Sequence, residues 1–143
     1  MSRELMQRLE GVWTGTETAV DGDDRVEATA RMAFQPVFDG RFMLCDYVLT
    51  AADRKTSVAH GVFRHDEASN RFMVTWFRYP AATKTQQTEG VTEGDNLTFH
   101  EVIDGRTTRV VYILAMDKLT LRTEVATSVG QWTTISEGAF RRR

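Results

Sequence analysis

The sequence changes character at residues 9–15, LEGVWTG. Just before this stretch, Leu5, Met6 and Leu9 fall on one face of a helix, because residues four positions apart lie above one another on a helix. Gly11 ends that pattern, since glycine is favoured immediately after a helix. Beyond it the helical period disappears, and short segments rich in Val, Thr, Phe and Tyr follow. The stretch therefore predicts one short N-terminal helix followed by β-strands.

The rest of the chain divides into about ten short segments with strand character. Apolar and polar residues alternate in several of them, as a half-buried strand requires. Turn sequences such as Asp21-Gly22, Asp39-Gly40 and Asp104-Gly105 separate them, because these residues accept the backbone angles of tight turns. The predicted strands are Val12–Val20, Val26–Gln35, Arg41–Thr50, Ser57–Arg64, Arg71–Tyr79, Lys84–Thr92, Asn96–Ile103, Thr107–Met116, Lys118–Thr127 and Gln131–Phe140.

Strands at this spacing, joined by hairpin turns, predict an antiparallel meander. An open sheet of ten strands has two unpaired edges, and closure into a barrel removes them. The sequence contains no linker, internal repeat or low-complexity tract. We therefore predict an all-β fold: a single antiparallel up-and-down β-barrel of about ten strands with a short N-terminal helix, spanning residues 1–143 as one domain. Segments such as 42–49 and 72–77 are apolar on both faces, so the pattern leaves open which face of each strand points inward.

The composition narrows the class of protein and its partners. The chain has 143 residues, with 18 Lys and Arg against 20 Asp and Glu, giving a net charge of −2. This balance argues against nucleic acid and acidic membrane surfaces as partners. Cys45 is the only cysteine, which fits a reducing compartment. Because we find no secretory signal and no apolar segment of about 20 residues, we expect a cytoplasmic protein.

Four motifs, in order along the chain, resemble those of a known bacterial family. They are LEGVWTG at 9–15, DGRF at 39–42, GVFRHD at 61–66 continuing to RF at 71–72 and TW at 75–76, and EGAFRR at 137–142. Together they resemble the bacterial domain-of-unknown-function family 1579, which is similar in fold to lipocalins. The resemblance implies a lipocalin-like (calycin) barrel in which Trp13 closes one end beneath a C-terminal arginine, Arg141 or Arg142. The family carries no assigned activity, so the resemblance leaves the function open.

Motifs for metal, nucleotide or nucleophile chemistry are missing from the sequence. His60, His65 and His100 do not have zinc-ligand spacing, and there is no phosphate-binding loop, dinucleotide glycine motif or Gly-x-Ser-x-Gly. We therefore expect no metal and no cofactor. Haem remains an alternative, because some calycin-like barrels that this chain resembles bind it through one histidine on a late strand. No histidine follows His100, so His60 or His100 would have to face the interior.

A barrel of this size can enclose one small molecule, in a site that is mostly apolar with a few polar groups. We predict that it binds a small apolar or amphipathic ligand. Asp46 and Arg78 are further polar groups that could orient the head of this ligand, and Arg109 is favoured because an apolar segment, 110–114, follows it. The predicted ligand-binding residues are Tyr47, His60, Trp76, Arg109, Tyr112 and Trp132.

Two other classes of function stay open. The first is an enzyme acting on a small apolar substrate inside the barrel, with His60 and Asp46 as the first candidates for acid–base groups. This hypothesis requires both side chains to face the interior. Glu89 and Glu101 also lie within predicted strands, but nothing in the sequence pairs them. The second is a structural or interaction module, for example a homodimer formed through a strand face that is apolar on its outer side.

Overall fold

A computed structural model describes residues 2–79, 86–103, 105–128 and 130–143. The ends of its ten strands lie within two residues of the predicted ends wherever the structure describes the predicted end. The predicted strand start at Lys84 and the predicted turn residue Asp104 lie outside the described residues. The elements are α1 (Ser2–Leu9), β1 (Gly11–Asp21), β2 (Asp24–Val37), β3 (Phe42–Ala51), β4 (Thr56–Asp66), β5 (Arg71–Tyr79), β6 (Gln86–Glu93), β7 (Asn96–Ile103), β8 (Arg106–Ala115), β9 (Lys118–Ser128) and β10 (Gln131–Arg142).

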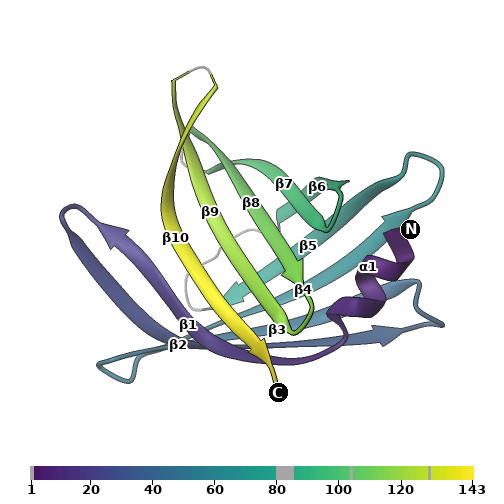
Figure 1. The fold of residues 1–143 in the computed structure, drawn as a ribbon, viewed down its shortest axis with the longest axis horizontal. Helices are drawn as coiled ribbons and strands as arrows, with labels where there is room; N and C mark the ends of the chain where they lie inside the picture. Colours follow the sequence, from purple (N-terminus) through teal and green to yellow (C-terminus); the bar gives the residue numbers. More distant parts are fainter. Residues whose placement is uncertain (1, 80–85, 104, 129) are drawn as a thin grey trace.

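The strands form one closed antiparallel barrel, which confirms the predicted fold (Figure 1). Each strand pairs with its neighbours in sequence, and β1 pairs with β10 to complete the circle. This closing ladder runs from Trp13 opposite Arg142 to Ala19 opposite Ser136. At its centre the two backbones approach so closely that a Cβ atom on Gly15 would lie 1.8 Å from the carbonyl oxygen of Ala139. Only glycine fits there.

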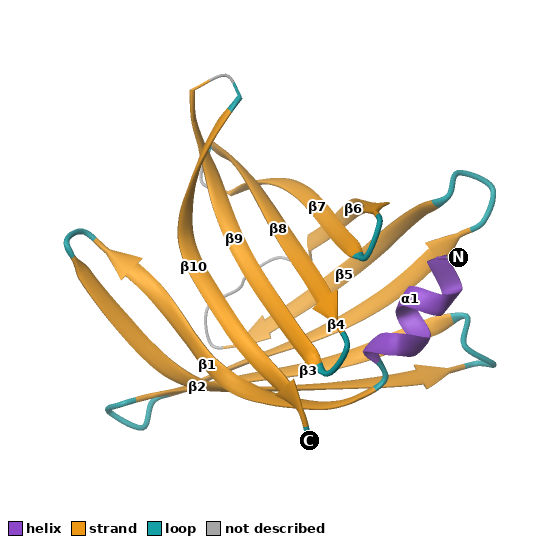
Figure 2. Ribbon diagram, in the orientation of Figure 1, coloured by secondary structure: helices purple, strands orange, loops and turns teal. Residues whose placement is uncertain are grey.

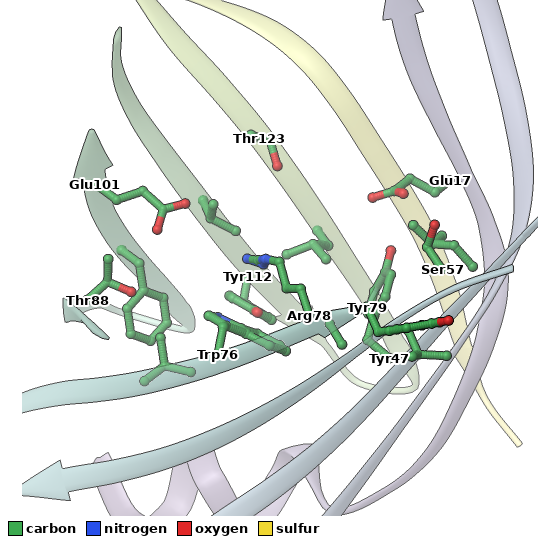
Figure 3. Close-up of a pocket in the computed structure, with 17 residues that line it drawn as sticks. Glu17, Tyr47, Ser57, Trp76, Arg78, Tyr79, Thr88, Glu101, Tyr112 and Thr123 are labelled. Atoms are coloured by element: carbon green, nitrogen blue, oxygen red, sulfur yellow. The ribbon is translucent and has the colours of Figure 1, made fainter. Parts of the chain in front are cut away.

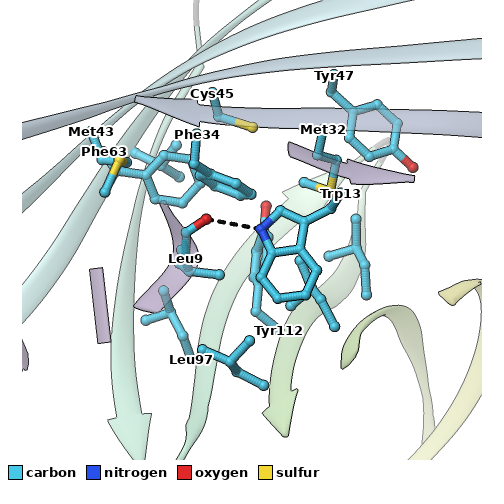
Figure 4. Close-up of a cluster of buried hydrophobic side chains, with 14 of the residues drawn as sticks. Leu9, Trp13, Met32, Phe34, Met43, Cys45, Tyr47, Phe63, Leu97 and Tyr112 are labelled. Atoms are coloured by element: carbon cyan, nitrogen blue, oxygen red, sulfur yellow. Dashed lines mark hydrogen bonds between the residues drawn. The ribbon is translucent and has the colours of Figure 1, made fainter. Parts of the chain in front are cut away.

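Helix α1 covers one end of the barrel and supplies part of the core (Figure 2). Leu5, Met6 and Leu9 are buried, in agreement with the apolar face predicted for the helix. Trp13 belongs to the same core. It is fully buried, and its indole N–H donates a hydrogen bond of 2.9 Å to the carbonyl oxygen of Leu9 (Figure 4). The helix and the first strand are thereby fixed to one another at the closed end.

Arg142 completes this closed end from the other terminus of the chain. Its guanidinium carbon lies 4.3 Å from the centre of the Trp13 ring, a cation–π contact. The same guanidinium donates hydrogen bonds to the carbonyl oxygens of Arg8 and Glu10. Of the two arginines that the sequence offered for this role, the structure identifies Arg142, and Arg141 is exposed.

Replacing Arg142 with methionine removes the cation above Trp13 and both hydrogen bonds to the helix end. We expect a loss of about 2 kcal/mol in the free energy of unfolding. Arg141→Met is the matched control, because that neighbour is exposed, and its effect should stay within about 0.5 kcal/mol. Urea denaturation of both variants measures the difference. Equal losses would contradict the role given to Arg142.

The barrel fixes which residues point inward, the point that the sequence left open. On β3 and β5 the buried residues alternate. Those inside are Met43, Cys45 and Tyr47 on β3, and Phe72, Val74 and Trp76 on β5. Outward residues of these strands are not all covered, and Phe77 is 49% exposed. Among the described residues, no helix is long and apolar enough to cross a membrane.

Candidate functional site

A cavity of about 290 Å³ lies inside the barrel, toward the end away from α1 (Figure 3). Its volume equals that of roughly ten water molecules in the liquid, near the lower limit for sites that hold small molecules. Aromatic and aliphatic side chains make up most of the lining. The lining residues are Glu17, Tyr47, Leu49, Ser57, Val58, Ala59, Val74, Trp76, Arg78, Tyr79, Thr88, Phe99, Glu101, Val110, Tyr112, Leu121 and Thr123.

Because every second residue of a strand faces the same side, two strands each place a ring and a charged group in the cavity. On β5, Trp76 and then Arg78 reach the cavity, and on β7, Phe99 and then Glu101 do the same. Each of these strands therefore carries an aromatic ring and, two positions further on, a charged group. Gly61 on β4 pairs with Trp76, and a Cβ there would lie 2.8 Å from the indole. The missing side chain leaves room for the Trp76 ring against the barrel wall.

Among the described residues, three charged side chains line the cavity: Glu17, Arg78 and Glu101. Within the described part of the chain, none of them has an opposite charge within 4.0 Å. The guanidinium carbon of Arg78 lies 5.2 Å from the centre of the Trp76 ring, and Glu17 accepts a hydrogen bond of 3.1 Å from Ser136. Burial raises the pKa of Glu101, and the nearby Arg78 partly offsets that rise.

Two tyrosine hydroxyls add neutral hydrogen-bonding groups to the site. Burial raises the pKa of Tyr112 and also of Tyr47, where the nearby Glu17 carboxylate raises it further. Both hydroxyls therefore stay protonated at neutral pH. The Tyr47 side chain is only 8% exposed, and its hydroxyl interacts with the Glu17 carboxylate beside it. The Tyr47 hydroxyl and the Glu17 carboxylate therefore form one polar spot in a lining that is otherwise mostly apolar.

Three of the six predicted ligand-binding residues, Tyr47, Trp76 and Tyr112, line this cavity. The structure places the other three, His60, Arg109 and Trp132, outside its lining. Each of these three belongs to the set of residues on its strand that points away from the interior. The physical reason is the same in every case, since a shift of one position along a strand reverses the direction of the side chain.

His60 pairs with Asp46 on the outer face, where the two side chains are 42% and 65% exposed. The Nδ1 atom of His60 lies 2.8 Å from Oδ1 of Asp46. Both residues therefore miss the interior, and the acid–base pair that we considered inside the barrel is not there. Nothing in the cavity replaces it with a paired carboxylate and histidine among the described residues.

Arg109 and Trp132 contact each other on the outside of the barrel. The guanidinium carbon of Arg109 lies 4.1 Å from the centre of the Trp132 ring, and its Nε lies 2.8 Å from Oε1 of Glu124. The ring of His100 is 6.2 Å from that of Trp132. The inward position beside Arg109 on β8 belongs to Val110. This group therefore packs the outer surface and does not meet the cavity.

The haem alternative needed a histidine that faces the interior. His60 and His100 lie on the outer face, and His65 is near the turn between β4 and β5, where its Nε2 is 3.1 Å from Asn70. None of the three lines the cavity. Within the described ranges, no group of three or more His, Cys, Asp or Glu side chains is placed to hold a metal ion. We therefore do not propose haem.

Sequence reasoning did not select Glu17 or Glu101 as site residues. A signal for Glu101 was present, because it continues the alternation of Leu97 and Phe99, both buried. Arg78, considered only as a group that could orient a ligand, continues the alternation of Val74 and Trp76 in the same way. A charged residue that extends a buried alternating set toward a strand end is therefore the pattern to search for.

The comparisons with known proteins concern the fold and the family. Among solved structures, the chain is similar to Rv2717c from M. tuberculosis, at 13% identity and a TM-score of 0.69, covering 98% of this chain and 96% of that one. It is also similar to EF1p2_mFAP2b bound to DFHBI, at 13% identity and a TM-score of 0.50, covering 100% of both chains. No curated protein matches the chain. The profile of the family described as "Protein of unknown function (DUF1579)" matches residues 1–142, and the chain therefore belongs to that family.

Proposed function

We propose that this protein binds a small apolar or amphipathic molecule inside its barrel. The observation that carries the proposal is the cavity of about 290 Å³, with aromatic walls and with the buried hydroxyl of Tyr47 at its side. An interior completely filled by side chains would have excluded it. A mostly apolar cavity with a few polar groups is the usual form of a small-molecule site.

The walls of the cavity support a flat, apolar ligand body. Phe99 and Tyr112 pack edge to face with their ring centres 5.9 Å apart, and Phe63 beneath them is in edge contact with Trp76 at 5.8 Å. Such contacts hold the rings in fixed positions, which lowers the entropic cost of binding. The complex of the similar barrel EF1p2_mFAP2b with DFHBI also supports a small molecule as the partner. Nucleic acid and membranes form no part of the proposal, and a cytoplasmic location fits it.

A neutral dye whose emission shifts to the blue in apolar surroundings, 6-propionyl-2-(dimethylamino)naphthalene, tests the proposal. We expect the protein to bind it and shift its emission. Val110→Trp should weaken binding by about tenfold or more, because Val110 lines the cavity and an indole there would fill it. Val111→Trp is the matched control, since the next residue on β8 points outward, and it should leave the affinity nearly unchanged. Fluorescence titration measures both.

The same titrations can overturn the proposal. Failure of the wild-type protein to bind the dye, together with organic extracts of purified protein in which mass spectrometry finds no small molecule, would count against it. Equal weakening by the two tryptophan variants would show that the dye binds somewhere other than the cavity. Circular dichroism on each variant checks that the barrel is intact.

A further inference from the structure

Two opposite charges face one another across one side of the cavity. The guanidinium of Arg78 comes from β5 and the carboxylate of Glu101 from β7, and their heads point toward each other (Figure 3). Arg78 acts electrostatically on Glu101, yet the two groups are more than 4.0 Å apart and form no ion pair. Because both side chains line the cavity, a ligand group placed there can contact a cation and an anion at once.

The chemistry of the two side chains defines what such a group must offer. The guanidinium of arginine can only donate hydrogen bonds, and an ionised glutamate can only accept them. The contact of Arg78 with the face of Trp76 occupies one face of the guanidinium and leaves its N–H edge for a partner. A group between them must therefore have an acceptor toward Arg78 and a donor toward Glu101.

A fully charged ligand head fits this arrangement poorly. A carboxylate beside Arg78 would also lie near Glu101, and Glu17 contributes a second negative charge to the cavity. An ammonium group beside Glu101 would lie near Arg78. Glu101 is half-buried and Arg78 is exposed, so the repulsion is stronger at Glu101. Each charged head nevertheless gains one contact and loses another. A neutral head that pairs with both residues avoids this conflict.

The residues beside Arg78 and Glu101 indicate what the body of the ligand must be. Trp76 lies two positions before Arg78, and Phe99 lies two positions before Glu101, so each charged group has an aromatic ring on its inner side. Tyr112 packs edge to face against Phe99, which extends the aromatic wall. A polar head held by the two charges would therefore leave the ligand body between the rings.

We propose that the cavity selects molecules with an aromatic body and a neutral head that carries an acceptor beside a donor, such as a carboxamide or a lactam, and that Arg78 and Glu101 bind this head. The proposal rests on the proposed function, since it names the class of ligand for the same cavity. It adds a preference for one kind of ligand head, which the volume of the cavity alone does not predict.

Three probes of the same shape test this preference: 2-naphthamide, 2-naphthoate and 2-(aminomethyl)naphthalene, which at neutral pH are neutral, anionic and cationic. Isothermal titration calorimetry on the wild-type protein should find the amide bound about tenfold more tightly than either charged probe. This order requires no variant, so it does not depend on whether a substitution disturbs folding.

Variants then assign the two charges. Glu101→Gln should strengthen naphthoate binding by about tenfold, because the like charge is gone, and Arg78→Met should weaken both the amide and naphthoate by about fivefold or more. Arg78→Met should strengthen binding of the cationic probe. Arg31→Met and Glu27→Gln are the matched controls, since both residues are exposed on β2, and they should leave the order of the probes unchanged.

The possible failures point to different conclusions. If a charged probe binds the wild-type protein as tightly as the amide, or if the protein binds the neutral dye but not the amide, the proposed preference is wrong while the binding function stands. If neither the dye nor any naphthalene probe binds, the proposed function itself fails. An unchanged order of probes in both Arg78→Met and Glu101→Gln would also overturn the assignment of these residues.

Discussion

Replacing Gly15 with alanine is expected to reduce the free energy of unfolding by more than about 4 kcal/mol, a large part of the total for a domain of this size. The added Cβ would lie 1.8 Å from the carbonyl oxygen of Ala139 and 2.9 Å from the Cα atom of Phe140. Both obstructing atoms belong to the backbone of β10, so no change of side-chain rotamer can relieve the clash. Separating the strands would instead break the β1–β10 ladder that closes the barrel.

Gly22 provides the matched control, because a side chain at this position meets backbone strain and no steric clash. It lies in the turn between β1 and β2 with φ at +63°, and nothing stands within 4 Å of a Cβ placed there. Gly22→Ala should therefore cost only about 1–2 kcal/mol, the strain of a left-handed backbone. Circular dichroism and urea denaturation compare the two. If Gly15→Ala were as stable as Gly22→Ala, the close approach of β1 and β10 would be wrong.

Trp13→Ala should cost about 4 kcal/mol and lower the melting temperature by about 10–15 °C. The ring is completely buried, so its removal leaves a hole beneath helix α1. The variant also loses the hydrogen bond from the indole to Leu9 and leaves the Arg142 guanidinium without the ring that it covers. The effect should therefore exceed that of removing Arg142 alone, which keeps the ring in place.

Two further variants separate the parts of this effect. Trp13→Phe keeps most of the apolar volume but cannot donate to Leu9, so its loss should be intermediate. Trp132→Ala removes a tryptophan that also lies under an arginine, but on the outer face, and should cost only about 1 kcal/mol. Thermal unfolding followed by circular dichroism ranks the three. Equal losses for Trp13→Ala and Trp132→Ala would contradict the central place of Trp13 in the core.

The fold could be predicted closely because its signals are local. Turn residues such as Asp39-Gly40 separate the strands, and the alternation from Val26 to Phe34 identifies a strand by itself. Barrel closure followed from a general argument about unpaired edges. The contact between Trp13 and a C-terminal arginine was implied by the family resemblance, and the choice of Arg142 over Arg141 needed the register of β1 against β10.

The site was harder to predict because it depends on which face of each strand a side chain points from. His60 and Arg109 are polar residues within strands, but each lies one position away from a residue that faces the cavity, Ala59 and Val110. Where a strand is apolar on both faces, the sequence cannot distinguish these two positions. Trp76 and Tyr112 line the cavity, as does Tyr47. The space left around them depends on the size of all the side chains that share the interior, and the sequence of one strand does not show this.

The ladder between β1 and β10 also has a consequence for folding. It pairs residues as far apart in the chain as Trp13 and Arg142, whereas the other ladders join strands that are neighbours in sequence. Hairpins between neighbours form early, but a contact of this range forms slowly because a long loop must close first. A chain in which β10 had not yet docked on β1 would be an open sheet with two bare edges that can pair with other chains. We therefore expect its aggregation during folding to be governed by the rate of this single closing step.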